Sequence, residues 1–270
     1  MSTSKRLAAP LGLVSDMLKI APKAIKIDPL KVDILKRPNE FFEQLRHGIA
    51  SSQQQISLAA LYMGTGELEQ RLVKDLVQAL EIKPDLHVNI LFDHSRGLRG
   101  KENNSITVLE GLLRSQHSHR VRASLYQMPQ LRTRGGRPLP LPSPINEAVA
   151  VQHIKAYVFD NDTLLSGANL SHDYFTDRQD RYLLVGASAG LAGHHHALVR
   201  ALAAHSARAG GGGGGGGDDD KRGRAADKHS MEKLRAKLLE ISETSTLNQE
   251  DSADTVVCAP AAAAAASAAA

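Results

Sequence analysis

The spacing of apolar side chains along the chain predicts alternating helices and strands. Phe41, Leu45 and Ile49 recur at four-residue intervals, which predicts an amphipathic helix over Glu40 to Ala50. The run from Gln55 to Met63 is almost continuously apolar and predicts a buried strand. The first two elements are therefore a helix and a strand that it can cover.

The same alternation continues through the next sixty residues. Gly64 and Gly66 interrupt the apolar run, and helical periodicity returns over Glu67 to Leu80. Further elements follow in order: a strand at 87–92, a polar loop at 93–100, a helix at 105–115 and a strand at 121–127. This order of elements predicts an α/β domain with a mixed sheet flanked by helices.

The segment from Ala148 to Leu170 is expected to form two strands joined at Asp160-Asn161-Asp162, because Asn and Asp tolerate tight-turn geometry. Before it, residues Pro129 to Pro144 are rich in Pro, Arg and Gly. That composition predicts a mobile loop rather than a core element. The loop separates the helical segments from the hairpin.

The hairpin carries the pattern H-x-K-x-x-x-x-D, formed by His153, Lys155 and Asp160. Residues two apart on a strand share a face, so we expect His153 and Lys155 to project together at a sheet edge or cleft. A neutral imidazole can attack phosphorus, and a neighbouring ammonium can offset the charge on phosphoryl oxygens. A surface strand with a solvated His and Lys is the alternative interpretation of the same pattern.

Around this pattern the chain resembles phosphatidylglycerophosphate synthase, a branch of the phospholipase D superfamily. The resemblance rests on three blocks, which together fall within residues 30 to 185: Ala59 to Gly66 with Glu69 and Leu72-Val73; Leu91 to Asp93 with Arg96-Gly97; and Gln152 to Asn161 followed by Leu165 to Ser171 and Tyr174 to Tyr182. It implies a phospholipase-D-like mixed sheet, one lobe only. The implied activity is transfer of a phosphatidyl group from CDP-diacylglycerol to glycerol 3-phosphate, without a cofactor or a metal.

The resemblance also implies roles for individual residues. His153 would be the nucleophile that forms a phosphatidyl-histidine intermediate, Lys155 a phosphate clamp, and Asp160 a group that orients an imidazole. Asn169 and Ser171 resemble the polar residues that follow the motif in the superfamily, so they become candidates for phosphate binding. Their offsets differ from the commonest G-S-x-N form.

Other candidates for substrate binding have ordinary structural explanations as well. Gly64 and Gly66 precede a helix and could present backbone N–H groups to a phosphate, or they could form a structural turn. Arg178 and Arg181 could bind a pyrophosphate bidentately, or they could pair with Asp180.

The histidine run His194 to His196 cannot direct all three rings at one ion from a regular element, so we predict no metal site there.

Charge and composition add little to this interpretation. The formal charge of +4 suits an anionic partner, but aromatic residues are few and no basic stripe runs beside the motif, which argues against nucleic acid. The single cysteine, Cys258, permits no disulfide within one chain. Outside the alanine tail the sequence has no apolar run of transmembrane length. Any membrane contact is therefore expected to be peripheral.

Five segments follow from these patterns. Residues 1–29 form an N-terminal segment whose basic residues permit a mitochondrial presequence, and residues 30–190 form the catalytic lobe. An Ala/Gly/His-rich linker is expected at 191–229, and residues 244–270 are expected to be a disordered low-complexity tail. Between them, residues 230–243 could form an amphipathic helix, with an isolated and frayed helix as the favoured interpretation. The resemblance implies a mitochondrial location at the inner membrane.

The superfamily builds one active site from two H-x-K-x-x-x-x-D motifs, and we find one among the twelve histidines of this chain. Three functions stay open: a phosphatidyltransferase, a truncated non-catalytic isoform or fragment, and a phosphodiesterase in which two single-motif chains pair as a homodimer. A self-complementary dimer would bring His153 opposite its copy.

Overall fold

An eight-stranded mixed sheet forms the centre of the structure, a computed structural model that describes residues 24–100, 102–128, 151–209, 233–234, 236–241 and 256–258. The strand order is β2-β8-β7-β6-β3-β4-β5-β9. Strands β3, β4 and β5 are parallel, and the other neighbours are antiparallel. The bounds are β2 Val32–Leu35, β3 Gln55–Ala59, β4 His87–Asp93, β5 Val121–Tyr126, β6 Ala156–Phe159, β7 Asp162–Ser166, β8 Tyr182–Val185 and β9 Ala207–Arg208.

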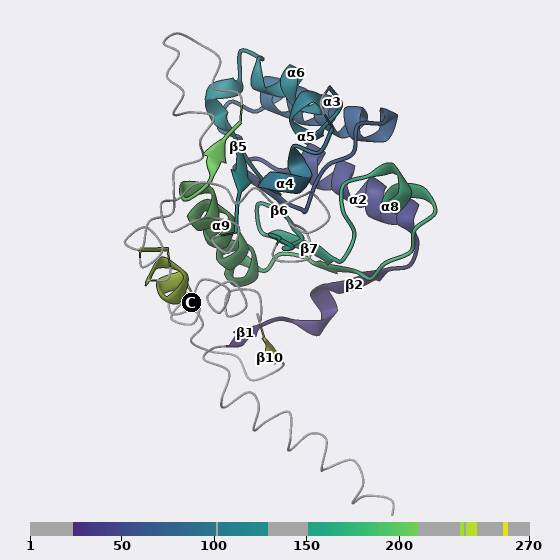
Figure 1. Cartoon of the computed structure of the whole chain (residues 1–270). Helices are drawn as coiled ribbons and strands as arrows, with labels where there is room; N and C mark the ends of the chain where they lie inside the picture. Colours follow the sequence, from purple (N-terminus) through teal and green to yellow (C-terminus); the bar gives the residue numbers. More distant parts are fainter. Residues whose placement is uncertain are drawn as a thin grey trace, which may run out of the picture.

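Helices cover both faces of this sheet, as Figure 1 shows. One face carries α2 (Pro38–Ser51), α3 (Glu67–Ile82), α5 (Ser105–Val108), α6 (Glu110–Leu113) and α8 (His172–Thr176), and the other carries α9 (Ala189–Ala204). The short helix α4 (His94–Gly97) follows β4, and 3-10 turns occupy Pro29–Lys31 and Ser118–Arg120. Strand β1 (Ala24–Lys26) pairs with β10 (Val256–Cys258) in a separate two-stranded sheet. The predicted α/β class, a mixed sheet flanked by helices, is confirmed.

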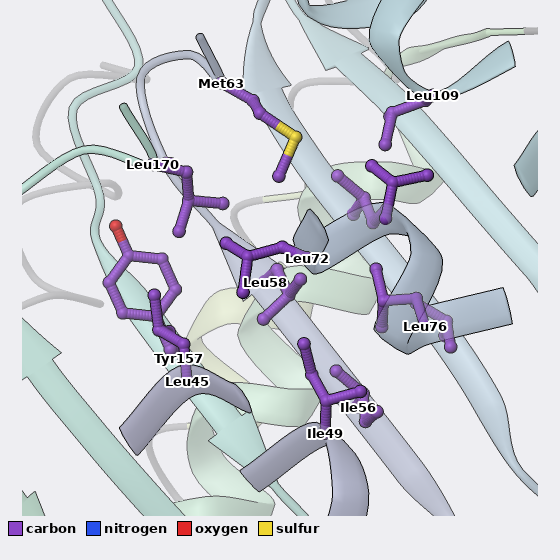
Figure 2. Close-up of a cluster of buried hydrophobic side chains, with 14 of the residues drawn as sticks. Leu45, Ile49, Ile56, Leu58, Met63, Leu72, Leu76, Leu109, Tyr157 and Leu170 are labelled. Carbon is purple, nitrogen blue, oxygen red and sulfur yellow. The ribbon is translucent and has the colours of Figure 1, made fainter. Parts of the chain in front are cut away.

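The larger core lies between the sheet and α2 and α3. Ile56 and Leu58 project from β3 toward Leu45, Ile49 and other buried residues of these helices, as seen in Figure 2. These side chains are at most 2% exposed. Burying each one removes apolar surface from water, which is worth roughly 1.5–3 kcal/mol per large aliphatic side chain. The four-residue spacing read from the sequence is thus the face of α2 that meets the sheet.

The opposite face of the sheet packs against α9. Its apolar residues Leu198, Val199 and Leu202 contact Ala59 and Leu91 of the sheet. Residues 233–234 and 236–241 are helical and pack on the same cluster through Leu234, Leu238 and Ile241. Within the described residues, no helix combines the length and the apolar character that a membrane crossing requires.

Most predicted elements are found close to their predicted positions: the helices at 40–50 and 67–80 and the strands at 55–63, 87–92 and 121–127 correspond to α2, α3, β3, β4 and β5. The predicted helix at 105–115 is instead two short helices, α5 and α6. The predicted loop at 93–100 begins with helix α4, because the Asp93 side chain accepts hydrogen bonds from the backbone of Ser95 and Arg96. The loop at 129–144 and most of the N-terminal segment lie outside the described residues.

The structure differs from the expectation of a linker beginning at residue 191. Helix α9 continues to Ala204, and β9 then pairs with β5, so the folded lobe extends to about Ala209. The abundance of Ala, Gly and His concealed a helix whose leucines are buried, and burial against the sheet outweighs the weak amphipathic pattern. Residues 233–234 and 236–241 likewise pack on α9 and are not isolated. Residues 210–232 lie outside the described part of the chain.

Three consecutive histidines of α9 are buried, and His196 has two partners in the sheet. Its Nε2 lies 3.0 Å from the Asp160 carbonyl oxygen, and its Nδ1 lies 2.7 Å from Ser57 Oγ. Because a carbonyl can only accept, Nε2 carries the proton and Nδ1 accepts from the Ser57 hydroxyl. His196 therefore joins α9 to β3 and to the β6–β7 turn in its neutral form.

These buried histidines predict that the fold is sensitive to acid. Burial lowers the pKa of His194 and of His196 to about 4. Between the unfolded pKa near 6.5 and pH 4, the unfolded chain binds more protons, so the unfolding free energy falls as the pH falls through that window. The loss should be at most about 3 kcal/mol per histidine. Urea denaturation at pH 7.5 and at pH 5 measures it.

The variant His196→Gln should be less stable than the parent at pH 7.5 and should depend less on pH. The exposed His47→Gln is the matched control and should keep the parental pH dependence. An identical pH profile for His196→Gln and the parent would contradict this account.

Candidate active site

His153 and Lys155 lie in an extended segment immediately before β6, near the carboxyl ends of β3 and β4. We expected them within a strand at a sheet edge or cleft. The strand instead begins at Ala156, and β6 is an interior strand of the sheet. The period of two is observed, because Ile154, Ala156 and Val158 pack together on the α9 side. The motif thus lies at the end of an interior strand.

His153 is exposed, and its surroundings favour the neutral imidazole. Partial burial lowers its pKa, and the positive charges of Lys155 and Arg96 lower it further, while the carboxylate of Asp93 acts in the opposite direction. Without a proton on one ring nitrogen, the imidazole has a lone pair available near neutral pH. This is the state that a nucleophile requires.

Lys155 is buried, with a side chain only 8% exposed. Burial lowers its pKa to about 8, and the negative charge of Asp180 counteracts part of that effect. Its ammonium donates to the His153 carbonyl oxygen at 3.3 Å. Lys155 is therefore largely charged at neutral pH, and it supplies a positive charge beside an exposed imidazole.

Asp93, at the end of β4, fixes the backbone next to His153. Its Oδ2 accepts from the Gln152 backbone N–H at 2.9 Å, and its Oδ1 accepts from Ser95 and Arg96. The Gln152 side chain is buried, and its carboxamide atoms find no hydrogen-bond partner among the described residues. One carboxylate thus connects β4, α4 and the motif segment.

The expected role of Asp160 in orienting an imidazole differs from its position in the structure. Its carboxylate accepts three backbone N–H groups, from Gln53, Gln54 and Gln55 at 2.6, 2.9 and 2.7 Å. It lies at the far end of β6 from His153, in a turn with a φ of 50° that Asp tolerates better than most residues. The His153 imidazole is not among its partners within the described residues, so Asp160 here anchors the hairpin to β3.

Asn169 and Ser171 lie in the loop after β7 and contact residues that follow β3. The Asn169 carboxamide oxygen accepts from the Leu61 N–H at 3.2 Å, and Ser171 Oγ lies 3.4 Å from the Tyr62 hydroxyl. The Arg96 guanidinium lies over the Tyr62 ring, 4.9 Å from its centroid. These contacts follow β3 and β4, so the loops after three strands converge on one region.

Gly64 and Gly66 are explained by a buried carboxylate. A Cβ at either glycine would overlap the side chain of Glu69, which is 1% exposed and accepts from the His172 N–H at 2.6 Å. An anion already occupies the space beside these glycines. The structural turn is therefore the better explanation, and we do not include the pair among the phosphate ligands.

Arg178 and Arg181 do not contact the motif side chains within the described residues. The Arg178 guanidinium lies 4.7 Å from the centre of the Tyr174 ring. Asp180 between them accepts from the backbone of Gly167 and Arg181 at 2.9 and 2.6 Å, and its charge acts on Lys155. The sequence contained this acid between two arginines, but nothing in the pattern indicated that its charge acts on the motif lysine.

The histidine run does not form a metal centre in the described part of the chain. No group of three His, Cys, Asp or Glu side chains is arranged there to hold an ion. His195 Nδ1 bonds the Leu191 carbonyl oxygen of its own helix, and His196 bonds Ser57 and Asp160. These rings instead help to pack α9.

The eight-stranded mixed sheet, with helices on both faces, places His153 and Lys155 at the end of an interior strand. A solved structure of phosphatidylserine synthase from Haemophilus influenzae Rd KW20 has this fold, with a TM-score of 0.59 at 18% identity over 92% of this chain and 51% of that one. At this level of identity the likeness concerns the fold alone. No family model matches the chain.

Sequence relatives are more specific. The chain is 41% identical over 180 residues to a probable CDP-diacylglycerol–glycerol-3-phosphate 3-phosphatidyltransferase of Dictyostelium discoideum, a match that covers 66% of this chain and 31% of that protein. It is 45% identical over 177 residues to the mitochondrial enzyme of that name from Gallus gallus, covering 63% of this chain and 31% of that protein. These matches confirm the resemblance to phosphatidylglycerophosphate synthase. The chain spans about a third of the length of these relatives.

The position of Asp160 predicts that its loss harms stability more than the electrostatics of His153. The variant Asp160→Ala removes three charge-assisted hydrogen bonds and places Ala at a positive φ, so the unfolding free energy should fall by about 3 kcal/mol. The exposed Asp177→Ala is the control and should cost less than about 0.5 kcal/mol. Urea denaturation measures both.

An NMR titration of the His153 ring compares Asp160→Ala with a further variant, Asp93→Asn. We expect its pKa to stay close to the parental value in Asp160→Ala and to fall in Asp93→Asn, since Asp93 acts to raise it. A large shift in the Asp160 variant would restore the orienting role that the sequence suggested.

Proposed function

We propose that this chain provides the nucleophile-bearing lobe of a phosphatidyltransferase that acts on CDP-diacylglycerol and glycerol 3-phosphate. The observation that carries the proposal is an exposed, neutral His153 beside the buried cation of Lys155. The printed names of the sequence relatives supply the substrates. The fold by itself would suit other phosphodiester chemistry equally well.

In the first step, one ring nitrogen of His153 donates its lone pair to the β-phosphorus that carries the diacylglycerol group. The P–O bond to CMP breaks, and CMP leaves with the bond's electron pair. Lys155 offsets the charge on the non-bridging oxygens, and Arg96, whose positive charge also acts on His153, supports the second phosphate. In the second step the acceptor hydroxyl attacks the phosphatidyl-histidine, loses its proton to a base and frees the imidazole.

The two steps need proton transfer to different extents. CMP departs as a phosphate whose second pKa is about 6, so it leaves readily without an acid. The hydroxyl of glycerol 3-phosphate is a poor nucleophile until a base removes its proton, and the second motif histidine serves that role in the superfamily. We propose that a second lobe, or a second copy of this chain across a two-fold axis, supplies it.

The names of the same relatives support a proposed location, and the proposed lipid substrate supports a proposed membrane contact. Several of them carry the word mitochondrial in their names, including the protein from Gallus gallus, so we propose a mitochondrial location. Contact with the inner membrane would be peripheral, because the phosphorus to be attacked belongs to a lipid headgroup. Nucleic acid is not among the proposed partners.

Incubation with CDP-diacylglycerol tests the nucleophile directly. We expect about one CMP released per chain and an intact-mass increase equal to one phosphatidyl group, detected after an alkaline quench. His153→Ala should abolish the adduct, and Lys155→Met should slow its formation at least about a hundredfold. The matched control is His172→Ala, which changes an exposed histidine at the start of α8. This variant should react normally.

Steady turnover with glycerol 3-phosphate should remain at least about a hundredfold below that of a two-motif enzyme, since general acid–base help is worth about 10² to 10⁴. Turnover that rises with protein concentration, together with the mass of a dimer in solution, would identify a second copy as the missing base. Fast, concentration-independent turnover by a monomer that needs His153 would overturn the requirement for a second histidine. Absence of any adduct would contradict the nucleophile itself.

A further inference from the structure

A polar cavity lies at the opposite ends of the strands from the motif. It has a volume of about 810 Å³ and opens where β3, β4 and β5 begin, beside the carboxyl-terminal part of α9 and beside β9. His153 is near the other ends of β3 and β4, so the two sites are separated by the length of β4. Seven residues at about 3.3 Å each amount to roughly 23 Å.

The sheet surface that lines this cavity is polar on its α9 side. Gln55 pairs in register with His87, and Asn89 pairs with Arg122, so their side chains form adjacent rows on that face. Nearer the carboxyl ends the same face is apolar, with Ala59 and Leu91 in the α9 core. Helix α9 therefore seals one half of this face, and the other half remains hollow.

The charges around the hollow are unbalanced. Four arginines line it, and Asp85 is the one acidic residue of the lining. Within the described residues, Arg122, Arg200 and Arg208 form no ion pair with a carboxylate. Burial is the main cause that lowers the pKa of Arg122, and the positive charge of Arg208 lowers it further. The two guanidinium groups therefore lie close enough to repel each other.

Hydrogen bonds within the fold use only part of the donor capacity of these arginines. Arg120 is fully engaged at the end of α3, where it donates to the carbonyl oxygens of Leu80, Lys83 and Leu86, so we leave it out of the site. Arg122 donates one bond to the Ala203 carbonyl oxygen, and Arg200 donates one to Gln55 Oε1. Each guanidinium has five N–H groups, so most donors of Arg122, Arg200 and Arg208 remain available.

We propose that this cavity binds the phosphate group of a phosphorylated ligand through Arg122, Arg200 and Arg208. Guanidinium forks match phosphate oxygens bidentately, and a bound dianion would relieve the repulsion between Arg122 and Arg208. The volume lies within the range of small-molecule sites and exceeds what a bare phosphate fills, so the group attached to the phosphate also enters the hollow. Either a soluble phosphate ester or a phospholipid headgroup has this chemistry.

The test follows the arginine side chains of the full chain by NMR. Titration with inorganic phosphate and with glycerol 3-phosphate should shift the Nε–Hε resonances of Arg122, Arg200 and Arg208 in the parent and equally in Lys155→Met. The double variant Arg122→Gln/Arg208→Gln should weaken this binding at least about tenfold. Arg114→Gln removes one charge from an exposed arginine paired with Glu110, and it should bind as the parent does.

Vesicles distinguish the two sources of phosphate. If the ligand is a headgroup, vesicles of phosphatidylcholine mixed with an anionic phospholipid should sediment the parent and Arg114→Gln but not the double variant. If it is a soluble ester, sedimentation should be the same for all three proteins, while glycerol 3-phosphate binding still depends on the two arginines.

Unchanged phosphate and vesicle binding in the double variant, or resonance shifts confined to the motif residues, would overturn the proposal. The outcome is independent of the phosphatidyltransferase assay, because that assay depends on His153 and this one does not.

Discussion

Burial of strand β6 on both faces is the constraint on which the site depends. Tyr157 and Phe159 enter the core beneath α2, while Ala156 and Val158 pack against α9. With both faces committed, a shift of one residue would exchange the two sets and bury side chains of the wrong size. The register of β6 is therefore fixed by its own core residues. Because His153 and Lys155 directly precede β6, that register also determines the direction in which they project.

Much of the fold could be predicted from the sequence because its parallel strands and main helices carry strong periodic patterns. The four-residue spacing in α2 and the apolar run of β3 are examples of patterns that burial produces directly. Edge strand β2 was missed because it is short and its side chains alternate little in burial. Helix α9 was missed because alanine, glycine and histidine dominate it, and its helical state depends on docking against a sheet that the local sequence does not reveal.

The candidate site likewise has a part that the sequence predicted and a part that it did not. The motif pattern identified His153 and Lys155, since a period of two along a strand is enough to bring both to one region. Asp93 and Asp180 act on this pair from the ends of other strands, and neither spacing nor composition relates residues so far apart along the chain. A carboxylate in a sequence motif suggests chemistry, so Asp160 was expected to orient an imidazole; in the structure its carboxylate accepts three backbone N–H groups where β3 begins.

Two carboxylates fix the two ends of the motif segment by hydrogen bonds to the backbone. Asp93 accepts from the backbone beside His153, and Asp160 accepts from the backbone at the start of β3. The number of residues between the histidine and the aspartate in the motif is then the number needed to run the length of β6 from one anchor to the other. The motif therefore fixes a distance along the strand as well as supplying reactive groups. A chain that keeps all three residue types but changes their separation would lose the hydrogen bonds of one of these carboxylates. The imidazole would then no longer be held rigidly in place before a substrate binds.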